Sequence, residues 1–203
     1  KSASQINPRV DKHSQDWPEY MRDTQNEINH FWFEELDPQQ WFQQSDSVDA
    51  EITERFEVTH QMANDGLCNH WAADADGALA LVIVLDQFPR HMYRNTPKAF
   101  ASDERALLIA KQAVHKGFDQ LLTPVKRGFL YLPYQHSETL SDQKKSVELF
   151  GSMAEENPAG DMYAKRHYVP IEKFGRFPHR NEILGRESSE EEIEFLKTHK
   201  GFL

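Results

Sequence analysis

The apolar positions of this chain recur at the spacing of amphipathic helices. In residues 24–36, Ile28, Phe31 and Trp32 share one face at i, i+3 and i+4. In residues 47–65, apolar residues at the same helical spacing form one face, and Thr59 is the last residue of that face. The pattern predicts helices over residues 24–36, 47–65, 76–88, 102–117, 141–153 and 188–201. Asp37-Pro38 predicts a helix stop followed by a new helix start.

The segment 74–88 is the most apolar part of the chain, and Asp76 is its expected N-cap. Its run of Val, Ile and Leu also suits a β-strand. We favour a helix because no other segment offers a partner strand. Leu81, Ile83 and Leu85 cannot all lie on one helix face, so this helix is predicted to be buried on most sides. The run is too short to cross a membrane.

Three segments repeat one plan, in which a proline is followed within three residues by histidine, then by a loop and a serine that caps the next helix. They read QFPRHMYRN, YLPYQHSE and RFPHRN, and their prolines, Pro89, Pro133 and Pro178, are 44 and 45 residues apart. The expected caps are Ser102, Ser141 and Ser188, the last in a capping box with Glu191. Proline ends helices, so the even spacing could be chance, but the recurring His and Ser favour a helix-pair repeat. Stacking of such pairs brings equivalent corners together.

The 203 residues carry a formal net charge of -10. This charge argues against nucleic acids and anionic membranes as partners, because both need a basic surface. Residues 175–186 nevertheless contain three arginines and a histidine, which suits a small anion. The only cysteine, Cys68, cannot form an internal disulfide, which favours a cytoplasmic location. The polar residues 1–22 are predicted to be a loosely ordered lead-in to one all-helical repeat domain over residues 23–203.

The motifs FWF (31–33), LDQFPR (85–90), YLPYQHSE (131–138), GRFPHRN (175–181) and LGR (184–186) together resemble a bacterial family known as domain of unknown function 924. The resemblance runs from about Phe31 to the C-terminus. It implies an all-α, tetratricopeptide-like right-handed superhelix of antiparallel helix pairs, and it implies no activity. His91 and Asn95 stand where the family usually has Asn and Gly.

The arginines after the prolines are the candidate anion-binding residues, since guanidinium groups match the oxygens of carboxylates and phosphates. They are Arg90, Arg94, Arg176 and Arg180. The alternative is structural: the same cations could neutralise helix C-termini or pair with carboxylates, for which Asp86 and Glu138 are the best placed.

His136, Glu138 and His179 are the candidate catalytic residues, because a histidine beside a carboxylate can act as a general base. Ordinary hydrogen bonding of buried histidines is the competing interpretation. The spacings typical of metal ligands, of a serine nucleophile elbow and of a phosphate loop are missing, so no metal or cofactor is predicted. The aromatic residues of 31–42 suit a core, or the wall of a pocket.

The sequence therefore predicts a helical-repeat binding protein that presents an Arg/His pocket to a small anion or an acidic peptide terminus. The alternative is a hydrolase or transferase that acts on an anionic substrate, with histidine as general acid or base and arginines stabilising charge. A scaffold without a site is the third possibility. A carboxylate–histidine pair facing the pocket would favour the enzyme. The sequence indicates no oligomeric state.

Overall fold

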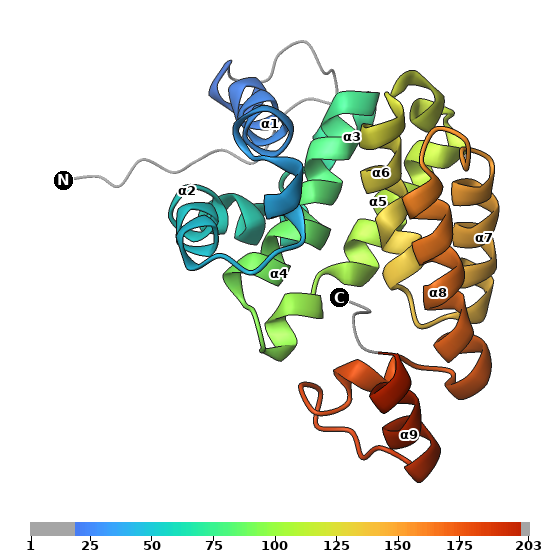
Figure 1. The fold of residues 1–203 in the computed structure, drawn as a ribbon. Coiled ribbons are helices and arrows are strands. Elements are labelled where there is room, and N and C mark those ends of the chain that lie inside the picture. Colours follow the sequence, from blue (N-terminus) through green and yellow to red (C-terminus); the bar gives the residue numbers. More distant parts are fainter. Residues whose placement is uncertain (1–18, 200–203) are drawn as a thin grey trace.

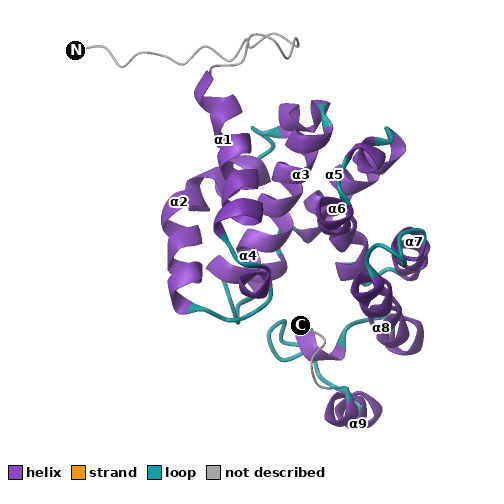
Figure 2. Cartoon of the chain, turned by 45° about the horizontal axis from the view of Figure 1, so that its top comes forward, coloured by secondary structure: helices purple, strands orange, loops and turns teal. Residues whose placement is uncertain are grey.

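The computed structural model describes residues 19–199, and the regular structure within this range is helical, without a β-strand (Figures 1 and 2). The main helices are α1 (Glu19–His30), α2 (Asp46–Asn64), α3 (Ala75–Val82), α4 (Phe88–Met92), α5 (Asp103–His115), α6 (Pro124–His136), α7 (Leu140–Gly151), α8 (Pro158–Phe174) and α9 (Glu190–Thr198). The prediction of an all-α protein is confirmed. Most of the predicted lead-in lies outside the described residues, and α1 begins at Glu19, before the expected Thr24.

The core is built around one bent helix that runs from α3 through a π-helical turn, Ile83–Gln87, into α4. Leu81, Ile83 and Leu85 on this helix have no exposed surface. It packs against α1, α2, α5 and α6 (Figure 1). The helix prediction for this apolar segment, and its burial on most sides, are therefore confirmed.

The second half of the chain is a row of helices in which α5, α6, α7 and α8 each pack on the next (Figure 2). The α6–α7 connection has only three residues, 137–139, and α9 lies apart from this row at the C-terminal end of α8 (Figure 1). No helix within residues 19–199 is both long enough and apolar enough to cross a lipid bilayer.

The three prolines of the repeat lie at helix ends or bends, as predicted. Pro89 lies in α4 directly after the π-turn, and Pro133 lies three residues before the end of α6. Pro178 begins a short 3₁₀ helix, Pro178–Arg180. A proline removes a backbone donor and clashes with the preceding turn, which explains these positions.

Several predicted caps were wrong by one or two residues. Asp74, rather than Asp76, caps α3, accepting from Gly77 N at 2.8 Å. Ser189 and Glu192, each one residue after the expected pair, form the capping box of α9. Sequence spacing fixes a cap only to within a turn, because the cap geometry depends on where the preceding loop ends.

The start of α7 and the buried face of α2 also differ from the sequence prediction. Thr139, and not Ser141, precedes α7. In α2, His60 is buried where Thr59 was expected on the apolar face. Asn95 has a φ of 62°, a left-handed conformation that favours Gly.

Candidate functional site

The three proline corners meet around His136. Asp86, from the first corner, lies with its Oδ1 2.8 Å from His136 Nδ1. Arg180, from the third corner, donates from Nη2 to the His136 carbonyl at 3.1 Å. These partners are 50 and 44 residues from His136 in sequence. The predicted convergence of the corners is therefore confirmed for His136 and Arg180, whereas His91 pairs with Asp49 and Arg176 with Glu192.

Asp86 is positioned by the π-turn before Pro89. Pro89 cannot donate to the Leu85 carbonyl four residues earlier, and the Ser102 hydroxyl donates to that carbonyl instead, at 2.6 Å. Arg90 Nη1 donates to the Asp86 carbonyl, also at 2.6 Å. Ser102 stands at the start of α5 as predicted, but its side chain completes this bend rather than capping α5. π-Turns inside helices are frequent at functional sites.

The Asp86 carboxylate is fully buried and ionised. Burial raises its pKa, but the attraction of His136 and Arg90 and the hydrogen bond from Gln87 Nε2, 2.7 Å long, outweigh burial and hold the pKa well below its ordinary value. Burial and the charge of Arg90 hold the pKa of His136 below 6.5 despite the pull of Asp86. At neutral pH, His136 is therefore neutral and donates its Nδ1 proton to Asp86, since a carboxylate can only accept. Nε2 is then the basic nitrogen.

His136 is held in place because it ends α6. The last carbonyl groups of a helix lack intrahelical partners. Here the side chain of Gln143, on α7, donates to the Gln135 and Ser137 carbonyls, each at 2.7 Å, and Arg180 takes the His136 carbonyl between them. These bonds fix the backbone from which the imidazole projects.

Arg90 and Arg180 share one carboxylate unequally. Arg90 forms two bonds with Asp103, of 2.7 and 3.0 Å, whereas Arg180 Nη1 lies 3.9 Å from it. The Nε–H of Arg180 is buried without a hydrogen-bond partner among residues 19–199. Burial and the neighbouring Arg90 lower the pKa of Arg180 to about 10. Arg180 is therefore charged and is attracted by Asp103, Glu138 and Asp86, but among residues 19–199 no carboxylate oxygen lies within hydrogen-bond distance of it.

The Arg180 guanidinium lies between two aromatic rings, 4.5 Å from the Phe100 centroid and 4.6 Å from the Phe177 centroid. Cation–π contacts of this kind stabilise a cation without supplying a negative charge. This explains how a largely buried arginine is tolerated with so little carboxylate contact.

Two more histidines stand near His136. The His167 and His136 ring centroids are 6.4 Å apart, and both His167 and His179 pack on Phe177. Burial and then His136 lower the pKa of His167 to about 3. Burial and then Arg180 lower the pKa of His179 to about 4. Both rings are therefore neutral at physiological pH.

Glu138 is not the carboxylate that pairs with His136. Both of its oxygens accept from Arg186, at 2.9 Å each, and Oε1 also accepts from Phe177 N at 2.7 Å. It ties the loop before α7 to the third corner. The sequence pairing of Glu138 with His136 is thus replaced by Asp86 with His136, because the turn after α6 directs the two side chains differently.

The structure gives Arg94 and Arg176 carboxylate partners outside this cluster. Arg94 forms two bonds of 2.9 Å with Asp49, which also lies 2.8 Å from His91. Arg176 forms bonds of 2.7 and 2.8 Å with Glu192, on α9. Of the four arginines named from the sequence, the fold brings Arg90 and Arg180 to His136.

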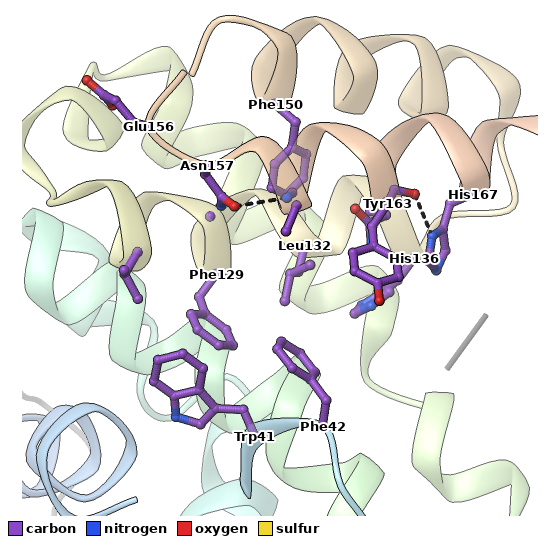
Figure 3. Close-up of a pocket in the computed structure, with 15 residues that line it drawn as sticks. Trp41, Phe42, Phe129, Leu132, His136, Phe150, Glu156, Asn157, Tyr163 and His167 are labelled. Carbon is purple, nitrogen blue, oxygen red and sulfur yellow. Dashed lines mark hydrogen bonds between the residues drawn. The ribbon is translucent and has the colours of Figure 1, made fainter. Parts of the chain in front are cut away.

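His136 borders two cavities. One, of about 500 Å³, also contains Arg180, Asp103, Ser137 and Glu138 in its wall. The other, of about 340 Å³, is largely aromatic and lies between α6, α8 and the segment after α1 (Figure 3). Figure 3 places His136, Tyr163 and His167 at one end of it. We refer to them below as the Arg180 cavity and the aromatic cavity. Within residues 19–199, no group of His, Cys, Asp or Glu is arranged to hold a metal ion.

Comparison with known proteins agrees with this fold. The model of the family described as bacterial protein of unknown function, DUF924, matches residues 28–200. The chain belongs to the DUF924 family. The structure of the protein of unknown function ATU0120 from Agrobacterium tumefaciens is similar, with a TM-score of 0.84 and 33% identity over 88% of this chain and 99% of that one. No curated protein matches the chain.

In this DUF924 protein, the sequence suggested Asp86 only as an ion-pair partner and gave Asp103 no role in a site. His167 was weighed beside His136 and His179 but was not chosen as a catalytic residue. Asp86 lies in the LDQFPR motif, so a motif signal for it existed. Asp103 follows directly after Ser102 and was read only as part of a helix start. His167 lies within an ordinary helical pattern that carries no signal of a site.

Proposed function

We propose that this protein is a hydrolase that cleaves an ester or amide bond in a substrate bearing a carboxylate. The observation that supports this most is that His136, which lines a cavity together with Arg180, is backed by the buried Asp86 at 2.8 Å. A carboxylate–histidine pair facing the pocket is the feature that separates an enzyme from a simple binding protein.

In the proposed reaction, His136 Nε2 takes a proton from a water molecule as the water oxygen attacks the carbonyl carbon. The imidazolium then returns the proton to the leaving oxygen or nitrogen as its bond to that carbon breaks. The products are a carboxylic acid and an alcohol or amine, and water is the only co-reactant. Asp86 keeps its charge, orients the ring and stabilises the imidazolium.

Arg180 is the proposed substrate-binding cation, because among residues 19–199 no carboxylate oxygen lies within hydrogen-bond distance of it. The partly buried carboxylates of the same cavity are already matched to cations: Asp103 to Arg90, Glu138 to Arg186 and Asp142 to Lys111. One available cation suits a monoanion better than a phosphate dianion, since a second negative charge would lie among these carboxylates without a counter-charge.

Hydrolysis of para-acetoxybenzoate, followed by the absorbance of the para-hydroxybenzoate released, tests the proposal. We expect the protein to accelerate this reaction and His136→Gln to lower kcat/KM by about 10²–10⁴-fold, the usual contribution of a general base. Arg180→Gln should raise KM for this anionic ester and leave the KM for neutral phenyl acetate unchanged. No acceleration over buffer, or full activity in His136→Gln, would contradict the proposal.

A binding protein without catalysis is the second candidate, and Arg180 favours it, because a bound carboxylate could accept from its Nε–H, which has no partner among residues 19–199, without any chemistry. The Ser137 hydroxyl, next to His136, donates to Asp142 at 2.7 Å and is therefore not poised as a nucleophile. In this case the Arg180 cavity would hold a small carboxylate or an acidic peptide terminus. The parent protein and His136→Gln would then bind levulinate equally and neither would cleave para-acetoxybenzoate.

We also propose that the helix row is tetratricopeptide-like, a right-handed superhelix of antiparallel pairs. The sequential packing of α5 to α8 and the nearly even spacing of the three proline corners support this. We place the protein in the cytoplasm because its single cysteine cannot form an internal disulfide, so the fold does not need an oxidising compartment.

A further inference from the structure

We infer that the substrate carries an apolar acyl group, which occupies the aromatic cavity while the carboxylate lies at Arg180. This inference rests on the proposed hydrolase and names its substrate class, an acylated carboxylic acid such as an N-acyl amino acid. His136 is common to the walls of both cavities. A substrate that reaches into both therefore places its ester or amide bond at His136.

The aromatic cavity has the size and lining of a site for an apolar group. An engineered cavity of about 150 Å³ holds a benzene ring, so 340 Å³ has room for a phenyl group or a chain of several carbons. Its lining includes Trp41, Phe42, Phe129, Leu132, Phe150 and Tyr163. In Figure 3 the rings of Trp41, Phe42 and Phe129 lie together on the side opposite α8.

Part of this lining is pre-organised although it is exposed. Phe42 is 62% exposed, yet its ring stacks on Phe129 with an interplanar angle of 6° and a centroid distance of 5.9 Å. Trp41 is held by a 2.7 Å hydrogen bond from Nε1 to the Trp32 carbonyl and contacts Phe129 edge-on at 4.9 Å. An apolar ligand would bury these rings without having to order them first.

A buried polar atom without a hydrogen-bond partner in residues 19–199 lies in the lining of each cavity. They are Gln135 Oε1 in the aromatic cavity and Arg180 Nε in the Arg180 cavity. Gln135 is only 4% exposed. Buried polar groups usually have partners, so we expect a polar substrate backbone to be recognised at these two residues.

Binding of uncleavable ketones tests the inference separately from catalysis. Levulinate has a carboxylate, a ketone in place of the scissile carbonyl and a single methyl group. Each methylene added at that methyl and buried in the cavity strengthens binding about fourfold. We expect the homologue with four more methylenes to bind at least about 50-fold more tightly than levulinate by calorimetry, and its neutral amide to bind more weakly.

Ala159→Trp supplies the matched perturbation. Ala159 is an exposed residue of α8 on the rim of the aromatic cavity, so the new ring fills the cavity without disturbing the core. We expect this variant to lose the preference for the long ketone and to keep its affinity for levulinate. Val58→Trp, at an exposed position on α2 outside both cavities, is the control and should keep the preference.

The outcomes separate the inference from the proposed function. Equal affinity for short and long ketones, or a preference that survives in Ala159→Trp, overturns the apolar subsite even if para-acetoxybenzoate is cleaved. A length preference that Ala159→Trp removes supports the subsite, and absence of cleavage would then overturn the hydrolase alone. If neither ketone binds, the apolar subsite is overturned, and the hydrolase is overturned as well if para-acetoxybenzoate is not cleaved.

Discussion

His167 should make the folded protein sensitive to acid. It is 7% exposed, and its pKa of about 3 lies far below the ordinary 6.5 because of burial and the neighbouring His136. Between these values the unfolded chain takes up a proton that the folded chain does not. The stability that neutral His167 contributes is therefore complete above pH 6.5 and is lost as the pH falls toward its folded pKa. At pH 5 the loss is about 2 kcal/mol, at roughly 1.4 kcal/mol per pH unit.

The assay is urea unfolding of the parent protein and of His167→Asn at pH 7.5 and pH 5. The substitution removes the hydrogen bond from His167 Nδ1 to the Tyr163 carbonyl, 2.8 Å long, and so lowers stability at both pH values. The informative quantity is the difference between the two pH values, which should be about 2 kcal/mol smaller in the variant. His115→Asn, at an exposed position on α5, is the matched control. An equal acid-induced loss in parent and His167→Asn would refute this reasoning.

Three further substitutions test the packing. Leu81→Ala, at a fully buried position, should lower the unfolding free energy by about 2–5 kcal/mol, and an unchanged urea midpoint would show that the central helix is peripheral. Ser189→Ala should cost about 1 kcal/mol by removing the cap of α9, with loss of protection in amide exchange confined to α9; global exchange instead would contradict this. Arg186→Ala should cost about 1–2 kcal/mol in chemical unfolding, since its partner Glu138 is only partly buried, and a neutral effect would show that this pair is not a clasp.

The helices and the meeting of the three corners were predictable because both depend on periodicity. Burial of 78–85 follows from an apolar run too dense for one helix face, and the contacts of Asp86 and Arg180 with His136 agree with the expectation that the evenly spaced proline corners converge. Such patterns are set by which residues must leave water, and they are visible without coordinates.

The pairing of charges at the corners was not predictable in the same way. Whether His136 contacts Asp86 or Glu138 depends on two local features of the backbone. These are the π-turn at 83–87 and the extended backbone directly after α6. Ser102 shows the same limit, because its hydroxyl serves the Leu85 carbonyl and not its own helix. Such local changes in backbone dihedral angles do not alter the spacing of the apolar residues, so the sequence pattern does not reveal them.

The aromatic cavity depends on long-range packing. Trp41 and Phe42 come from a short segment after α1, whereas Phe129 lies on α6. The sequence predicted aromatic residues there that suit either a core or a pocket wall. The cavity lies between these rings and α8, and the apolar spacing of the sequence does not fix that arrangement (Figure 3).

The pH dependence of kcat/KM for para-acetoxybenzoate hydrolysis tests the role of the Asp86–His136 pair most directly, because this profile reports the pKa of the essential base in the free enzyme. The account predicts one ascending limb whose midpoint lies below 6.5, since burial and Arg90 lower the pKa of His136. The limb should be absent from the residual activity of His136→Gln, and Asp86→Asn should lower the plateau. A limb with its midpoint above 6.5, or a limb that persists in His136→Gln, would contradict the account.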